Sequence, residues 1–143
     1  MATLTVEILS PEAALWRGTA NALIARSSEG DFTILPQHTE TVGDVVSSIV
    51  RVETDEGEVA FAVHSGYFQV RPGDGEGVTL ATVLAGVAER TSEIDVARAQ
   101  VARDAAEAQL ATASKGDQSD GTAQLAAAAA LERAELRLRA AAR

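Results

Sequence analysis

The feature that most limits what this chain can fold into is a change in sequence character near Ser92. Before it, short apolar runs rich in Val, Leu and Ile alternate with turn residues, as in β-strands. After it, Ala, Glu and Arg dominate, and apolar residues recur three and four positions apart, as on one face of a helix. The 143 residues suffice for one sandwich-sized domain with an appendage. We therefore expect two parts, residues 1–88 and residues 89–143.

The first part is predicted to be an antiparallel β-sandwich or flattened barrel. Six segments have the length and apolar content of strands, and clusters of Pro, Gly, Asp and Glu between them have the composition of turns. Many short strands in succession are typical of sandwiches and barrels. The strand-like segments are residues 4–9, 22–25, 45–52, 59–63, 66–70 and 78–84.

The second part is predicted to be an antiparallel hairpin of two helices, residues 92–113 and residues 122–142, joined by a polar loop at residues 114–121. Ser92 is suited to be the N-cap, with Asp95 in the position of a capping-box carboxylate. The fold class is therefore mainly β plus α. The predicted apolar stripes are Ile94, Ala97, Val101, Ala105, Ala108 and Thr112 on the first helix, and Ala127, Leu131, Ala134, Leu138 and Ala141 on the second.

Alanine dominates both stripes, and the stabilisation gained by burial scales with the apolar area that is buried. Helices of roughly 20 residues are also marginally stable alone in water. We therefore expect a hairpin that is weakly held and able to open, extend or repack.

The composition excludes several classes of function. The net charge is −9, and residues 1–90 carry 13 acidic against 5 basic side chains. With one Lys in the whole chain, it lacks the clustered cations that a nucleic acid would require. It has no Cys, so it forms neither disulfides nor thiolate metal sites. Its longest apolar run, residues 125–131, is too short to span a bilayer, and we expect a soluble, cytoplasmic chain.

No catalytic or metal site is predicted. The two histidines, His38 and His64, are not spaced as metal ligands, and Ser65 lacks the glycine context of a nucleophile elbow. The glycines at 73, 75 and 77 alternate with acidic residues and precede no helix, so they indicate a loop, not a phosphate cradle. We expect a protein that is not an enzyme.

Three motifs occur in order along the chain. Residues 28–38 read SEGDFTILPQH, residues 61–70 read FAVHSGYFQV, and Ala88-Glu89 precedes an I-D-x-x-R-A run at residues 94–99. Over its whole length the chain resembles the epsilon subunit of the bacterial F-type proton-translocating ATP synthase. That family has S-E-G-x-x-x-[IV]-x-P-G-H, then F-x-V-x-G-G-[FY]-x-x-V, then A-E and I-D-x-x-R-A. Gln37 stands where the family usually has Gly, so a left-handed backbone conformation there would be less favourable in energy.

The resemblance implies a non-catalytic subunit of the central stalk. The sandwich would dock on the gamma subunit and on the ring of c subunits, and the extended hairpin would reach the catalytic alpha and beta subunits and restrain ATP hydrolysis. Membrane association would come only through the complex, on the cytoplasmic face. Glu29, Asp31 and His38 match positions on loops that face the c ring and gamma, and Glu40 and Thr41 stand where the family is usually apolar. The alternative interpretation is that Glu29 and Asp31 are ordinary solvated turn acids and that His38 is a buried turn histidine.

Some members of the family bind ATP on the folded hairpin, so the resemblance suggests regulatory ATP, although no cofactor is required. Arg133 and Arg137 lie four residues apart, on one helix face, where they could attract phosphates. Alternatively, Asp95 is a cap and the arginines are ordinary surface charges. The positions that match the family's ATP site are Glu89, Ile94, Asp95, Arg98, Ala99, Arg133 and Arg137.

A rival interpretation is a free-standing adaptor, in which the sandwich binds one partner and the Ala-rich hairpin dimerises. This adaptor would self-associate in isolation, whereas a stalk subunit would be monomeric alone and would bind gamma one to one. A small-molecule enzyme is the third alternative, and the sequence offers no paired acid and base for it.

Overall fold

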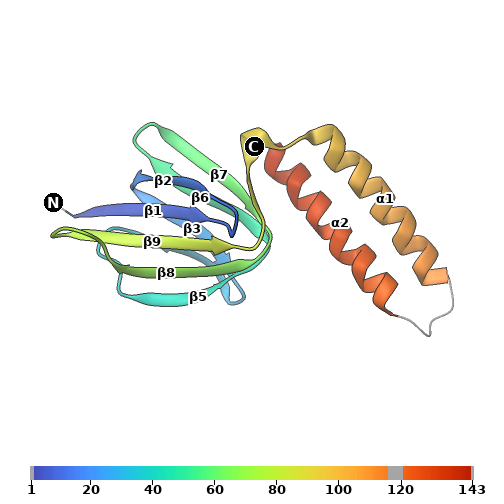
Figure 1. The fold of residues 1–143 in the computed structure, drawn as a ribbon, viewed down its shortest axis with the longest axis horizontal. Coiled ribbons are helices and arrows are strands. Elements are labelled where there is room, and N and C mark those ends of the chain that lie inside the picture. The colour runs from blue at the N-terminus through green and yellow to red at the C-terminus, as the bar shows by residue number, and fades with distance from the viewer. Residues whose placement is uncertain (1, 116–120, 143) are drawn as a thin grey trace. The chain divides into compact units, whose positions relative to one another are not determined.

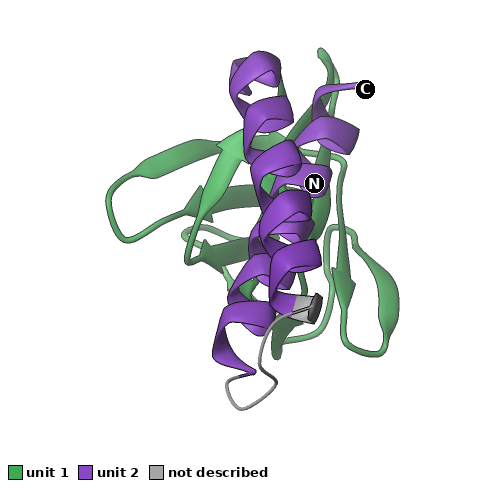
Figure 2. Cartoon of the chain, turned by 90° about the vertical axis from the view of Figure 1, so that its right-hand side faces the viewer, with its two compact units in different colours: residues 1–91 green, residues 92–143 purple. Residues whose placement is uncertain are grey.

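The computed structural model describes residues 2–115 and 121–142. It divides into two compact units, Met1–Thr91 and Ser92–Arg143, which are coloured separately in Figure 2. The first unit holds all the strands and the second holds the two long helices (Figure 1). The prediction of a β-sandwich followed by a helical hairpin is therefore confirmed.

Two five-stranded sheets make up the first unit. The first sheet has the strand order β2-β1-β9-β8-β5, and the second has the order β10-β7-β6-β3-β4. Neighbouring strands are antiparallel except for β1 and β9, which are parallel. The strands are β1 (Thr3–Leu9), β2 (Ala14–Ala20), β3 (Ala22–Ser27), β4 (Gly30–Ile34), β5 (Thr41–Val45), β6 (Ser48–Thr54), β7 (Gly57–Val63), β8 (Gly66–Pro72), β9 (Val78–Ala85) and β10 (Ala88–Arg90).

The core of the sandwich comes from the inward-facing residues of both sheets. Strand β1 shows the alternation most clearly, because Leu4, Val6 and Ile8 are fully buried and the residues between them are half-buried. Aliphatic side chains fill most of the core, as the low aromatic content predicts. The aromatic contact is between Phe32 and Phe68, whose ring centroids are 4.4 Å apart.

Two non-glycine residues of the sandwich have a left-handed backbone, Gln37 with φ = 70° and Ser65 with φ = 73°. Both occupy positions at which the family motifs have Gly. The left-handed conformation considered for Gln37 is therefore present, and for such a residue it costs about 1–2 kcal/mol. A hydrogen bond from the Gln37 N–H to Thr79 Oγ1, 2.9 Å long, helps to hold that loop in place.

The second unit begins with a short 3₁₀ turn, η1 (Thr91–Glu93), followed by α1 (Val96–Lys115) and α2 (Thr122–Ala141). The prediction that Ser92 is the N-cap is wrong, because Ser92 lies inside the 3₁₀ turn and α1 begins four residues later. Asp95 is the cap instead: its Oδ1 accepts a hydrogen bond from the Arg98 N–H at 3.0 Å.

The two predicted helix stripes have different outcomes. The stripe of α2 is confirmed in part: its members are buried or half-buried, but the buried residues Leu136 and Ala140 lie outside it. The stripe of α1 is wrong beyond Ile94, because its other members are exposed and Val101 is 70% exposed. Since alanines lie on every face of α1, apolar spacing did not single out one face. The side of α1 that is buried or half-buried consists of Ala99, Arg103, Ala106, Leu110 and Ala113.

Candidate interaction sites

The turn between β3 and β4, residues 27–30, carries Glu29, and we call it the acidic turn. Ser27 Oγ donates to the Gly30 carbonyl at 3.1 Å and accepts from the Glu29 N–H, also at 3.1 Å. Gly30 has φ = 126°, a backbone conformation that is readily accessible only to glycine. These contacts fix the backbone on both sides of Glu29, whose side chain is exposed.

Asp31, at the base of the acidic turn, is paired with Arg26 across the β3–β4 ladder. Arg26 Nε donates to Asp31 Oδ1 at 2.6 Å, and a second guanidinium nitrogen lies 3.4 Å from Oδ2. This hydrogen-bonded guanidinium holds the pKa of Asp31 below its usual value of 3.8 and raises that of Arg26. Because the Asp31 charge is already matched, Glu29 is the more available carboxylate, and within the described residues it has no ion pair.

His38 lies beyond the other end of β4, so the structure does not bring it together with Glu29 and Asp31. Its Nδ1 is 2.8 Å from the Thr39 carbonyl oxygen, which accepts the hydrogen bond from this nitrogen. The His38 N–H also donates to the Leu35 carbonyl at 3.1 Å. The three residues predicted to contact rotor subunits therefore lie in two separate regions of the sandwich, with Glu29 and Asp31 in one and His38 in the other.

The structure adds an exposed apolar patch that the strand pattern did not reveal. Val42, Tyr67 and Leu84 are 72%, 66% and 49% exposed. Tyr67 lies opposite Leu84 in the β8–β9 ladder, and Val42 lies opposite Gln69 in the β5–β8 ladder, so the three side chains share one face of the first sheet. Large exposed side chains gathered on one face are typical of protein–protein contacts.

The residues matched to an ATP site are spread over several elements. Glu89 is on β10 in the first unit, whereas the others belong to the second unit. Asp95 is exposed and its Oδ1 caps α1, whereas Ala99 and Ile94 are buried, at 2% and 9% exposure. Arg98 and Arg133 are exposed. Arg137, the third arginine of the set, is half-buried.

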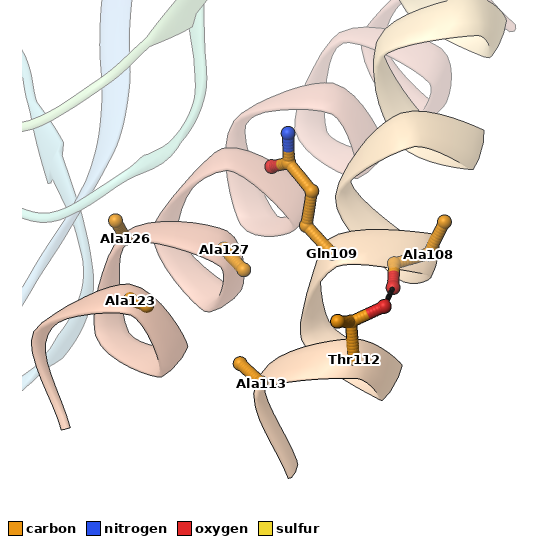
Figure 3. Close-up of a pocket in the computed structure, with 7 residues that line it drawn as sticks. All are labelled: Ala108, Gln109, Thr112, Ala113, Ala123, Ala126 and Ala127. Atoms are coloured by element: carbon orange, nitrogen blue, oxygen red, sulfur yellow. Dashed lines mark hydrogen bonds between the residues drawn. The ribbon is translucent and has the colours of Figure 1, made fainter. Parts of the chain in front are cut away.

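A groove of about 550 Å³ lies between α1 and α2 at a different place from the matched arginines. Thr112 is held to its own helix by a 3.0 Å hydrogen bond from Oγ1 to the Ala108 carbonyl, while Gln109 extends into the space between the helices (Figure 3). The groove exists because alanine side chains are too short to fill the space between two helices. It is lined by Ala108, Gln109, Thr112, Ala113, Ala123, Ala126 and Ala127.

Residues 2–115 and 121–142 contain neither a cluster of metal-ligating side chains nor a helix that could cross a membrane. In that part of the chain no three His, Asp or Glu side chains come together as a metal site would require. In the same part, neither helix combines the length and apolar character that crossing a membrane requires.

A sandwich with exposed contact surfaces, followed by a thinly packed two-helix arm, defines a class of docking protein that works through its partners. The chain belongs to the ATP synthase delta/epsilon chain family: residues 3–91 match the family's β-sandwich domain and residues 92–142 match its long α-helix domain. The predicted resemblance is thus confirmed, and the chain is a non-catalytic subunit of an ATP synthase.

Individual relatives agree with this assignment. The ATP synthase epsilon chain of Bordetella parapertussis is 38% identical over 141 residues, covering 97% of this chain and 96% of that protein. The epsilon chain of Brevibacillus brevis is 39% identical over 111 residues, covering 77% of this chain and 80% of that protein. A chain in the Euglena gracilis mitochondrial ATP synthase structure of OSCP, F1 and c ring shares the fold, with a TM-score of 0.76 and 22% identity, over 100% of this chain and 83% of that one.

Proposed function

We propose that this chain docks through its sandwich on the gamma subunit and the c ring of the central stalk, at the cytoplasmic face of the membrane, and regulates ATP hydrolysis through its hairpin. One observation carries the proposal: the structural division at Thr91 and Ser92 coincides with the division between the two family domains. A unit that docks and a unit that regulates can then be separate parts of one chain.

The sandwich supports the docking role with two kinds of surface. The apolar patch of Val42, Tyr67 and Leu84 offers area that becomes favourable to bury on association. The acidic turn offers the exposed carboxylate of Glu29, whose backbone N–H is held by Ser27 Oγ, and this carboxylate suits a cationic side chain on a partner. We assign these two surfaces, and the loop that carries His38, to contacts with the c ring and gamma.

The hairpin supports the regulatory role because the buried side chains of its helices are mostly alanines, which bury little apolar area each. The larger side chains of Val101 and Leu125 are 70% and 73% exposed. An arm that buries little within itself and leaves large aliphatic side chains outside can exchange one set of contacts for another at small cost. In its extended form the arm would contact the alpha and beta subunits.

Copurification tests the docking role against the adaptor alternative. We expect the isolated chain to be a monomer. With gamma it should form a stable one-to-one complex that buries the exposed apolar patch of the sandwich. Light scattering of the chain alone would measure its oligomeric state, and light scattering of the purified complex would measure its stoichiometry. A stable dimer that forms through the hairpin and fails to bind gamma would support the adaptor instead.

We further propose regulatory ATP binding to the closed hairpin, supported by the exposed Arg98 and Arg133. A ligand at ten times its dissociation constant stabilises the bound form by about 1.4 kcal/mol, which is roughly tenfold in population. Millimolar ATP should therefore slow cleavage of the hairpin by elastase. Arg133→Ala should abolish the slowing, while Arg139→Ala, an exposed arginine on the same helix, should leave it unchanged. Equal cleavage with and without ATP would exclude the binding.

A further inference from the structure

Asp44 joins the two sheets at the acidic turn. It lies on β5 at the edge of the first sheet, and Ser28 lies in the turn between two strands of the second sheet. Asp44 Oδ2 accepts a hydrogen bond from the Ser28 N–H at 2.9 Å, and its Oδ1 accepts one from Ser28 Oγ at 3.1 Å. One half-buried carboxylate therefore holds both the backbone and the side chain of a single turn residue.

A backbone hydrogen bond two residues from Asp44 and two residues from Ser28 reinforces this link between the sheets. The Val46 N–H donates to the Arg26 carbonyl at 3.0 Å, so the end of β5 is tied to β3 on the near side of the turn. Hydrogen bonds to a charged acceptor are stronger than those between neutral groups, which makes the Asp44 contact the firmest of those that reach the turn from the other sheet.

The contacts around the acidic turn leave one side chain for a partner. Ser27 and Ser28 are both used within the fold, and Asp31 is paired with Arg26. Glu29 lies between them with its backbone held and its carboxylate exposed. A short loop held in one conformation before it meets a partner loses less conformational entropy on binding.

We propose that Asp44 is a positioning residue: by holding Ser28 through two hydrogen bonds, it fixes the acidic turn so that Glu29 is presented to a cationic side chain of a partner subunit. This inference rests on the proposed function, in which the acidic turn contacts the rotor. It adds a residue outside the recognised motif, on a strand of the other sheet, to the determinants of that contact.

A double-mutant cycle tests the proposal in the complex. The full-length chain and its variants would be titrated into ATP synthase stripped of this subunit, and the dissociation constants compared. We expect Glu29→Gln to weaken binding by about threefold, in the range of an exposed ion pair. Asp44→Ala should weaken it similarly. The double variant should bind no worse than Glu29→Gln alone, because Asp44 acts through Glu29.

Two further variants separate positioning from a general loss of stability. Asp74→Ala removes the same charge from the turn that follows the far end of β8, and it should leave binding unchanged. Asp44→Asn keeps an acceptor for the Ser28 N–H and should retain most of the affinity. In the full-length chain alone, hydrogen exchange at the Ser28 amide should be faster in Asp44→Ala than in wild type and nearly normal in Asp44→Asn.

The outcomes are distinguishable. If Glu29→Gln binds as wild type does, the proposed rotor contact of the acidic turn is wrong. If Glu29→Gln weakens binding but Asp44→Ala does not, or if the two effects add, the positioning role is wrong while the rotor contact stands. If Asp44→Ala fails to fold, Ser28→Ala, which removes only the hydroxyl bond, replaces it in the cycle, and additivity with Glu29→Gln again overturns the proposal.

Discussion

Ending the chain at Thr91 should raise the rate of ATP hydrolysis by the assembled complex while leaving the sandwich folded and docked. The cut falls at the boundary between the two compact units, so it removes the whole hairpin and no strand. Arg90 must be kept, because it is the register partner of Phe61 in the β10–β7 ladder. Phe61 is fully buried, and a frayed β10 would loosen the sandwich around it.

The size of the rise measures how often the hairpin occupies its inhibitory state. If that state is favoured by about 1.4 kcal/mol, about nine complexes in ten are inhibited and removal of the hairpin raises the rate roughly tenfold. The measurement is steady-state hydrolysis by membrane-bound complex containing either the full or the shortened chain, at equal occupancy of the subunit. An unchanged rate with the complex intact would contradict the regulatory role and leave this chain as a docking and coupling subunit.

The sequence predicted the sandwich because strand-length apolar runs and turn residues are local signals. It could not predict the order of strands, since the parallel pairing of β1 with β9 joins Thr3 to Val78 across most of the first unit. The buried face of α1 was mispredicted for a related reason. When alanine occupies every face of a helix, the partner helix selects the face, and here it selects the side with Leu110 rather than Val101.

In the candidate sites too, local features were predicted from the sequence and contacts between strands were not. The motif placed Glu29 and Asp31 on a turn, but it could not show that Arg26 matches the Asp31 charge or that Asp44 holds Ser28. Both depend on which strands become neighbours. The sequence indicated that Asp95 is a capping residue, but it assigned the N-cap itself to Ser92. Asp95 is the N-cap because the 3₁₀ turn takes up the preceding residues.

The neighbouring residues Ser65 and Gly66 should respond in opposite directions to small substitutions. Ser65→Gly removes the left-handed strain at φ = 73°, which costs about 1–2 kcal/mol, but glycine also increases the entropy of the unfolded chain. We expect a net gain of up to about 1 kcal/mol. A Cβ on Gly66 would lie 2.2 Å from the Leu84 carbonyl oxygen, a backbone atom that cannot rotate away. Gly66→Ala should therefore cost about 3 kcal/mol, the upper part of the usual range for overpacking.

Gly86→Ala is the matched control, because a Cβ there would meet no atom within 4 Å. Trp16 is the one tryptophan of the chain and lies on β2, so its fluorescence during thermal unfolding reports on the sandwich alone. A loss of 3 kcal/mol corresponds to a fall of roughly 12–24 °C in Tm for a unit of this size. If Gly66→Ala and Gly86→Ala had the same Tm, the close approach of β8 to β9 at the pair of Gly66 and Ala85 would be contradicted.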